Sequence, residues 1–319
     1  MANIPLGFEL AGWIAKVNKR LGEISTQIQS VVSTVATTAG NFVLNRGNPV
    51  DVDLGTHGLT GTFLELTLTE TFSATGGAIT TYTDSFGDSW TVHTYYYTGV
   101  TDTFVTTGTR DILYLLVGGG GPGGISTGVG SGGGGGGGGV NTGVLTSFSG
   151  TLNVFVGRGA LNENSSASAS YIQTPSMSID KRAIGGGKGG WNNLGVASAG
   201  GLYGGGASTG TGAQNGGNGA PMTDIYGITH RGGANGELSY LSVYTLAGGG
   251  GGAGTSGSQG VGGEGLALTF QDGVTSVVYG SGGAPNGGVP GTAGPGRGGE
   301  GSGVSRAGTD GIVILKYKT

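Results

Sequence analysis

Residues 118–124 read GGGGPGG and directly follow an apolar run at residues 111–117, DILYLLV. Glycine then dominates as far as residue 308, and a second apolar run, GIVILKY, occupies residues 311–317. Glycine loses more backbone freedom on folding than any other residue, so this region becomes ordered only if a fold offsets that entropy loss. The two strand-like runs at its ends indicate an ordered domain rather than a flexible tether.

The composition excludes several classes of protein. The 319 residues include 79 Gly but only 8 Pro, which excludes a collagen triple helix. Charged residues make up 10%, whereas disordered chains usually combine high charge with few apolar residues. The net charge of −4 argues against a nucleic-acid partner, and the absence of cysteine excludes disulfides and thiolate metal sites. No stretch has the roughly 20 apolar residues of a membrane helix, so we expect no membrane insertion.

Residues 8–39 are predicted to form one helix with a coiled-coil seam. Apolar residues recur there at alternating steps of four and three, and β-branched residues at the second seam position favour trimers or tetramers over dimers. The alternative is an amphipathic helix packed on its own domain. The predicted oligomerisation residues are Leu10, Ile14, Val17, Leu21, Ile24, Ile28, Val31 and Val35.

The rest of the chain is predicted to be mainly β. Runs rich in Thr, Tyr and Val at residues 62–72, 78–83, 89–97 and 101–106 have the spacing of antiparallel hairpins. Further strands are expected at residues 144–156, 238–247, 266–270 and 274–279. The predicted organisation is a coiled-coil anchor at 1–40, an extended connector at 41–60, a β-rich neck at 61–84 and a glycine-rich β domain at 85–319.

Part of the glycine-rich region repeats with a period of three. From Gly186 to Gly219 every third residue is small, and shorter runs of this kind span 251–263 and 288–294. A period of three is typical of a left-handed extended helix without internal hydrogen bonds, whose N–H and C=O groups need partners in neighbouring segments. We therefore predict packed polyglycine II-like segments, although so much glycine also produces threefold runs by chance.

The order of motifs resembles a known family. Residues 92–105 (VHTYYYTGVTDTFV) and 111–124 (DILYLLVGGGGPGG) resemble the glycine-rich domain of many phage tail-fibre and related virion proteins. Residues 152–159 (LNVFVGRG) and 310–317 (DGIVILKY) fit the same order, so that the likeness covers about residues 85–319. The resemblance implies a structural or host-attachment role in a homotrimeric fibre and brings no catalytic residues. Residues 160–184 and 220–247 depart from it in being poorer in glycine, and we expect insertions that carry specificity there.

The sequence offers little for catalysis. His93 alternates with aromatic residues in a predicted strand, and a structural role is expected. Residues 185–190 (GGGKGG) lack the spacing of a phosphate-binding loop, and the carboxylates Glu237, Glu264, Asp272 and Glu300 show no pairing typical of glycosidases. Asp51, Asp53 and His57 are expected in solvated turns rather than at a metal. We expect no enzyme, no cofactor and no metal.

Recognition is the expected function. Aromatic residues in loop-like sequence suit sugar or protein surfaces, and loops on a rigid scaffold are where binding residues gather. The expected protein is a phage tail fibre or adhesin in the virion, fixed to other virion proteins by its N-terminus and touching a host glycan or protein by its C-terminal domain. The alternatives are a purely structural collar, neck or head decoration, and an ice-binding protein. The receptor-binding candidates are Trp191, Tyr203, Tyr226, His230 and Arg231.

Overall fold

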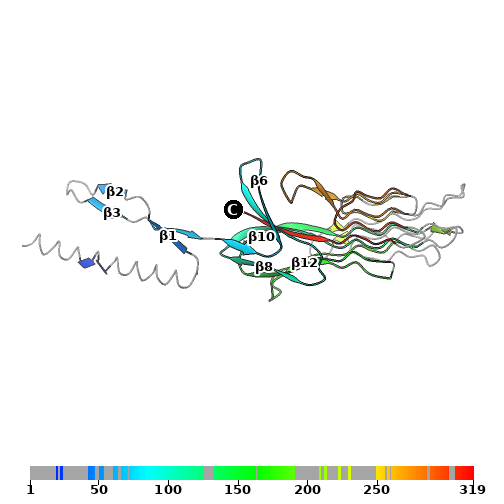
Figure 1. Cartoon of the computed structure of the whole chain (residues 1–319), viewed down its shortest axis with the longest axis horizontal. Coiled ribbons are helices and arrows are strands. Elements are labelled where there is room, and N and C mark those ends of the chain that lie inside the picture. The colour runs from blue at the N-terminus through cyan, green and yellow to red at the C-terminus, as the bar shows by residue number, and fades with distance from the viewer. Residues whose placement is uncertain are drawn as a thin grey trace, which may run out of the picture. The chain divides into compact units, whose positions relative to one another are not determined.

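A computed structural model describes most of the chain from residue 72 onward and short pieces before it (Figure 1). The chain divides into two compact units, Met1–Ser73 and Ala74–Thr319. The described residues are 19–20, 22–23, 42–46, 50–53, 60–63, 66–70, 72–125, 132–162, 164–190, 208–209, 212–213, 222–223, 229–230, 249–255, 257–258, 260–285, 288–301 and 306–319.

The first unit contains two antiparallel strand pairs. β1 (Phe42–Arg46) pairs with β4 (Leu66–Glu70), and β2 (Val50–Asp53) pairs with β3 (Thr60–Phe63). β1 and β2 fall in the range predicted as a connector. The boundary between the units, after Ser73, falls in the range predicted as a neck, and the predicted domain limits stay a prediction.

Residues 19–20 and 22–23 are helical, within the range predicted as a helix. Arg20 and Glu23 form an exposed ion pair at 3.5 Å, of the kind that contributes little to stability. The seam residues Leu10, Ile14, Val17, Leu21, Ile24, Ile28, Val31 and Val35 lie outside the described residues, and the coiled coil stays a prediction.

The second unit is mainly β-sheet, as predicted, and its first sheet has five antiparallel strands in the order β10-β9-β20-β7-β6. The last strand of the chain lies in the middle, where Leu315 is aligned with His93 on one side and with Tyr114 on the other. The strands are β6 (Ala78–Thr83), β7 (Ser89–Tyr95), β9 (Arg110–Val117), β10 (Val140–Phe148) and β20 (Ile312–Lys318).

The second sheet has the order β13-β12-β11-β8-β5. The single strand predicted at 144–156 is in fact two, because the chain turns at Gly150, whose φ of 121° suits only glycine. Residues 160–184, expected as an insertion, supply two of the strands in this sheet. The strands are β5 (Ser73–Thr75), β8 (Asp102–Thr107), β11 (Thr151–Phe155), β12 (Ser170–Gln173) and β13 (Asp180–Ala183).

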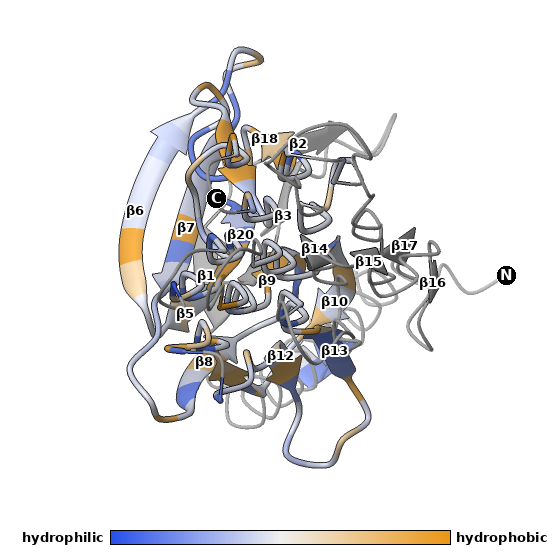
Figure 2. Cartoon of the chain, turned by 90° about the vertical axis from the view of Figure 1, so that its right-hand side faces the viewer, coloured by the Kyte–Doolittle hydropathy of each residue, from blue (hydrophilic) through white to orange (hydrophobic). Residues whose placement is uncertain are grey.

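The two sheets pack face to face, as the end-on view in Figure 2 shows. His93 of β7 lies edge-on to Phe104 of β8, with ring centroids 5.0 Å apart, and both side chains are fully buried. At one side of this interior the Asn141 amide donates to the Arg182 carbonyl at 2.9 Å. The interior is therefore an apolar core with a hydrogen bond between the two sheets at its side.

A hairpin covers the opposite face of the first sheet. It consists of β18 (Leu266–Leu268) and β19 (Val277–Tyr279), and Tyr279 is fully buried in a cluster with Val92, Leu115, Val117, Ile312 and Ile314. Lys316 also lies on this face and is 8% exposed. Its ammonium group donates to the Tyr82 hydroxyl at 3.0 Å and to the Phe270 carbonyl at 2.9 Å, so it ties the hairpin to the sheet.

Two further strand pairs are short. β14 (Ser208–Thr209) pairs with β15 (Gly212–Ala213), and β16 (Met222–Thr223) pairs with β17 (Thr229–His230). The strand predicted at 238–247 lies outside the described residues.

Glycine-rich segments continue from the sheets and lie side by side (Figure 1). We call this set the glycine array. Its members are residues 118–124, 132–139, 157–160, 184–190, 249–254, 260–265, 280–284, 294–301 and 306–311.

Hydrogen bonds in the array repeat every three residues. Three N–H groups of the segment 118–124 face the segment 132–139, at N···O distances of 2.8 to 2.9 Å. Donors three residues apart thus face the same neighbour, which is the pattern of an extended helix with three residues per turn. The donor–acceptor pairs are Gly118–Gly139, Gly121–Gly136 and Gly124–Gly133.

The segment 118–124 has neighbours on all sides. It donates to three segments, at Gly139, Ser168 and Thr309 among others, and its carbonyls accept from three more. Those accepting pairs are Gly186 to Gly119, Ala160 to Gly120 and Gly299 to Gly121. Pro122 lies three residues after Gly119, so an N–H at position 122 would point to the same side as that of Gly119. Proline has no N–H, and it is tolerated there because no bond from this position is needed.

The spacing of the array admits only glycine at many positions. A Cβ atom on Gly121 would lie closer than 3.0 Å to the Gly187 carbonyl, and one on Gly138 would meet the Gly118 carbonyl in the same way. Gly186 and Gly189, from the predicted threefold run, donate to the array at 2.8 Å. Later members of that run lie outside the described residues, except Ala213 in β15.

Candidate functional site

The glycine array has a strand end and a distal end. Gly118 follows β9 directly, and its partner Gly139 directly precedes β10. Gly124 and its partner Gly133 lie at the other end of the same two segments, away from the strands. We call that other end the distal end.

Several segments end together at the distal end. Gly133 donates to the Gly190 carbonyl at 3.0 Å, and Gly301 donates to the Ala284 carbonyl at 2.8 Å. A Cβ on Gly301 would collide with the Gly132 carbonyl, so these two pairs are adjacent. The connecting stretches 126–131, 191–248, 286–287 and 302–305 therefore all leave the array from this end.

The longest stretch begins and ends beside one segment. The Gly190 carbonyl accepts from Gly133, and the Gly251 carbonyl accepts from Gly137 at 2.9 Å. Gly190 and Gly251 thus both flank the segment 132–139. The array holds 58 intervening residues (191 to 248) at two rigid points.

An ion-pair network lies near the distal end. Glu300 pairs with Arg297 at 3.1 Å and with Arg306 at 3.8 Å. The Arg306 side chain is 61% exposed, while its backbone carbonyl accepts from Gly123 at 3.0 Å. The array thus presents an accessible guanidinium whose backbone is fixed.

The predicted receptor-binding residues belong to the stretch 191–248. Trp191, Tyr203, Tyr226 and Arg231 lie outside the described residues. Of His230 the structure describes only the backbone, which pairs with Met222. Their role therefore stays a prediction, but the two points at which the chain carrying them leaves and rejoins the array are known.

His93, the glycine run 185–190 and Glu264, which the sequence analysis weighed for catalysis or phosphate binding, make hydrogen bonds within the fold. The His93 ring bonds to the Gly76 carbonyl at 2.6 Å through Nδ1, and burial lowers its pKa. The N–H groups of Gly186 and Gly189 donate to the Gly119 and Pro122 carbonyls of the array. Glu264 bonds to the Thr292 hydroxyl at 3.0 Å, far in sequence from the Glu300 network.

Within the described part of the chain, no cluster of three or more His, Asp or Glu side chains has a geometry suited to a metal ion. In the same residues no helix is long and apolar enough to cross a membrane.

Sequence reasoning missed one concave site. Residues of β6 and of the β18–β19 turn, about 190 positions apart in the chain, line a common groove. Asp272 was considered only as one carboxylate among several, because nothing in the local sequence shows that it faces Thr80 and Tyr82. Only the fold brings these residues together.

The sequence of residues 96–318 matches the family described as a glycine-rich domain. This range begins just after β7 and ends with β20, so it includes the array and most of both sheets. No curated protein is similar enough in sequence to count as a relative. Because the match covers more than half of the chain, the chain belongs to the glycine-rich domain family.

Proposed function

We propose that this protein is a homotrimeric appendage of a phage particle, held to other virion proteins by its N-terminus and contacting the host surface through the distal end of the glycine array. The array in this proposal is a bundle of polyglycine II-like helices that acts as a rigid support. Its partner at the distal end is a glycan or protein of the host surface. No enzyme activity and no cofactor are part of the proposal.

The observation that carries it is the convergence of the connecting stretches on one end of the array. Binding residues gather on loops that a rigid scaffold positions. In the array N–H groups three residues apart are bonded to the same neighbouring segment, so the points of departure, such as Gly190 and Gly301, are fixed. The longest of these stretches, residues 191–248, begins and ends at this end of the array and carries the predicted binding residues.

The resemblance to glycine-rich domains of tail-fibre proteins supports the placement in a virion. A purely structural collar, neck or head decoration is the main alternative and would use the same array as a spacer. An ice-binding protein is the other, and measurable thermal hysteresis by the purified protein would favour it.

The test is adsorption of the purified full chain to host cells. Residues 191–248 are replaced by a short Gly-Ser linker, which is feasible because both ends flank the segment 132–139. Residues 160–190 are kept, since β12 and β13 belong to the second sheet. We expect the shortened protein to fold and to lose adsorption.

The control variant changes the first sheet instead. Val144→Thr alters an exposed position of β10, 49% accessible, and is expected to leave adsorption unchanged. If the shortened protein adsorbs as the full chain does, or if the full chain never adsorbs yet remains on particles, the structural role replaces the adhesin.

A further inference from the structure

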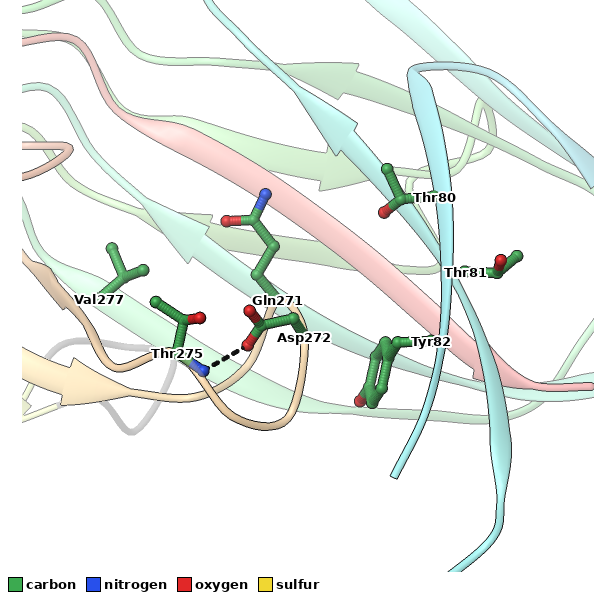
Figure 3. Close-up of a pocket in the computed structure, with 7 residues that line it drawn as sticks. All are labelled: Thr80, Thr81, Tyr82, Gln271, Asp272, Thr275 and Val277. Carbon is green, nitrogen blue, oxygen red and sulfur yellow. Dashed lines mark hydrogen bonds between the residues drawn. The ribbon is translucent and has the colours of Figure 1, made fainter. Parts of the chain in front are cut away.

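A groove of about 360 Å³ lies between the edge strand β6 and the turn that joins β18 to β19 (Figure 3). It is lined by Thr80, Thr81 and Tyr82 on one side and by Gln271, Asp272 and Thr275 on the other. It belongs to the sandwich and not to the distal end of the array. Its chemistry is independent of the function proposed above.

The β6 side of the groove is an open sheet edge. β6 is the terminal strand of the first sheet, and its residues 78–81 are exposed. Consecutive side chains of a strand point to opposite faces, and in Figure 3 Thr80 and Tyr82 point toward the hairpin turn while Thr81 points away from it. The edge therefore offers the Thr80 hydroxyl together with outward-facing backbone groups.

The opposite wall holds an ordered carboxylate. Asp272 Oδ1 accepts from the backbone N–H of Val274 at 2.9 Å and of Thr275 at 2.7 Å. Gly273 makes this turn possible with a φ of 74°. Bonds from the Thr275 side chain and from the backbone lower the pKa of Asp272, which keeps it charged. Gln271 stands beside it with an amide that both donates and accepts.

Trp90 and Lys316 hold the Tyr82 side chain in place. It stacks on Trp90 with centroids 6.4 Å apart, and its hydroxyl accepts from Lys316 at 3.0 Å. An aromatic face and the half-buried Val277 supply the apolar part of the lining. Fixed apolar faces surrounded by a few polar groups are the usual composition of a small-ligand site.

We propose that this groove binds a neutral sugar ring. The hydroxyl, amide and carboxylate groups that line the groove match a ligand with many hydroxyls. The Tyr82 ring suits the C–H face of such a ligand. Asp272 and Asp84 disfavour anionic ligands, since like charges repel across short distances. The Lys316 ammonium near Tyr82 is buried and already bonded to Tyr82 and Phe270. The Asp272 carboxylate instead favours hydroxyl donors, which give it charge-assisted hydrogen bonds.

An extended peptide added to the β6 edge is the competing occupant, because open strand edges recruit other strands. It would use backbone groups of β6 and would not depend on Gln271 or on the charge of Asp272. The two occupants are therefore separated by side-chain variants of the hairpin turn.

The experiment is saturation-transfer NMR on the full chain with glucose, galactose, mannose and N-acetylglucosamine as separate probes. We expect transfer to at least one of them, and competition by an excess of the same sugar. Sialic acid, which carries a carboxylate, is expected to give no transfer.

Two variants locate the binding. Asp272→Asn keeps the acceptor for the Val274 and Thr275 N–H groups but removes the charge, and Gln271→Ala removes the amide. Asp272→Asn is expected to weaken binding by about tenfold, as loss of a charge-assisted bond does. Gln271→Ala removes a neutral hydrogen bond and is expected to weaken binding by about threefold to tenfold. Asp102→Asn is the matched control, because this exposed carboxylate of β8 likewise accepts a backbone N–H, from Thr103 at 2.7 Å.

Absence of transfer to all four neutral sugars overturns the proposal, as does binding that Asp272→Asn and Gln271→Ala leave unchanged. Binding that Asp102→Asn weakens equally also contradicts it. The protein shortened at 191–248 is expected to keep this sugar binding, so a failure here is distinguishable from a failure of host adsorption.

Discussion

At the scale of the residue, close backbone packing makes single glycines indispensable. Gly121→Ala places a methyl group against the Gly187 carbonyl and pushes apart two segments joined by 2.8 Å hydrogen bonds. Overpacking of this kind costs about 1–3 kcal/mol, and the backbone cannot move without breaking further bonds, so we expect roughly 3 kcal/mol. Urea unfolding followed by near-ultraviolet circular dichroism measures the change.

Gly22 provides the control for that substitution. It is helical, and a Cβ there meets nothing within 4 Å, so Gly22→Ala is expected to leave the unfolding of the β unit unmoved. If Gly121→Ala proves as harmless as Gly22→Ala, the array is not packed as described.

His93 makes stability depend on pH. Its Nδ1 bonds to Gly76, its Nε2 is buried without a partner, and burial lowers its pKa from 6.5. The unfolded chain therefore takes up a proton more readily, and stability falls as pH drops below about 6.5, by at most ~1.4 kcal/mol per pH unit. Thermal midpoints between pH 5 and 8 measure this slope.

His93→Gln is the matched variant, because its amide can still donate to Gly76 but does not titrate. We expect a flatter profile between pH 5 and 7 at some loss of overall stability. An unchanged slope would assign the pH dependence to groups other than His93.

At the scale of the element, β20 closes the first sheet from the C-terminal end of the chain. It pairs with both β7 and β9 and buries Val313, Ile314 and Leu315 completely. A chain ending at Gly311 loses this strand and leaves two inner edges open, so we expect no cooperative unfolding transition and rapid proteolysis. A chain lacking only Thr319, which lies outside β20, is expected to behave as the full chain does.

The elements also show how far sequence reasoning reaches. Strands with strong apolar or Thr-rich runs, such as β7, β9 and β20, were predicted because their pattern is local. The turn at Gly150 was missed, because the alternation continues through it and only its backbone angle reveals the break. β12 and β13 were missed as sheet members, since pairing with β11 is a long-range contact that spacing does not encode.

The array was predicted only in outline. The threefold period is visible in the sequence, but the pairing of residues 118–124 with 132–139, 184–190 and 306–309 depends on which segments lie next to each other. Glycine carries no side chain that specifies a neighbour. The groove at Asp272 could not be predicted either, because its two walls come from segments far apart in the sequence.

At the scale of the whole molecule, the proposed attachment depends on assembly, because linked weak sites gain strength through effective concentration. We predict that the full chain sediments as a trimer and that a chain lacking residues 1–40 sediments as a monomer. Charged residues introduced into the predicted coiled-coil seam test the trimer without shortening the chain. Ile14→Lys combined with Ile28→Lys should dissociate the trimer, since buried unpaired charge is costly, whereas Arg20→Ala, at an exposed helical position, should not. A trimer that survives both the truncation and the seam variants would place the assembly contacts in the β-rich part of the chain.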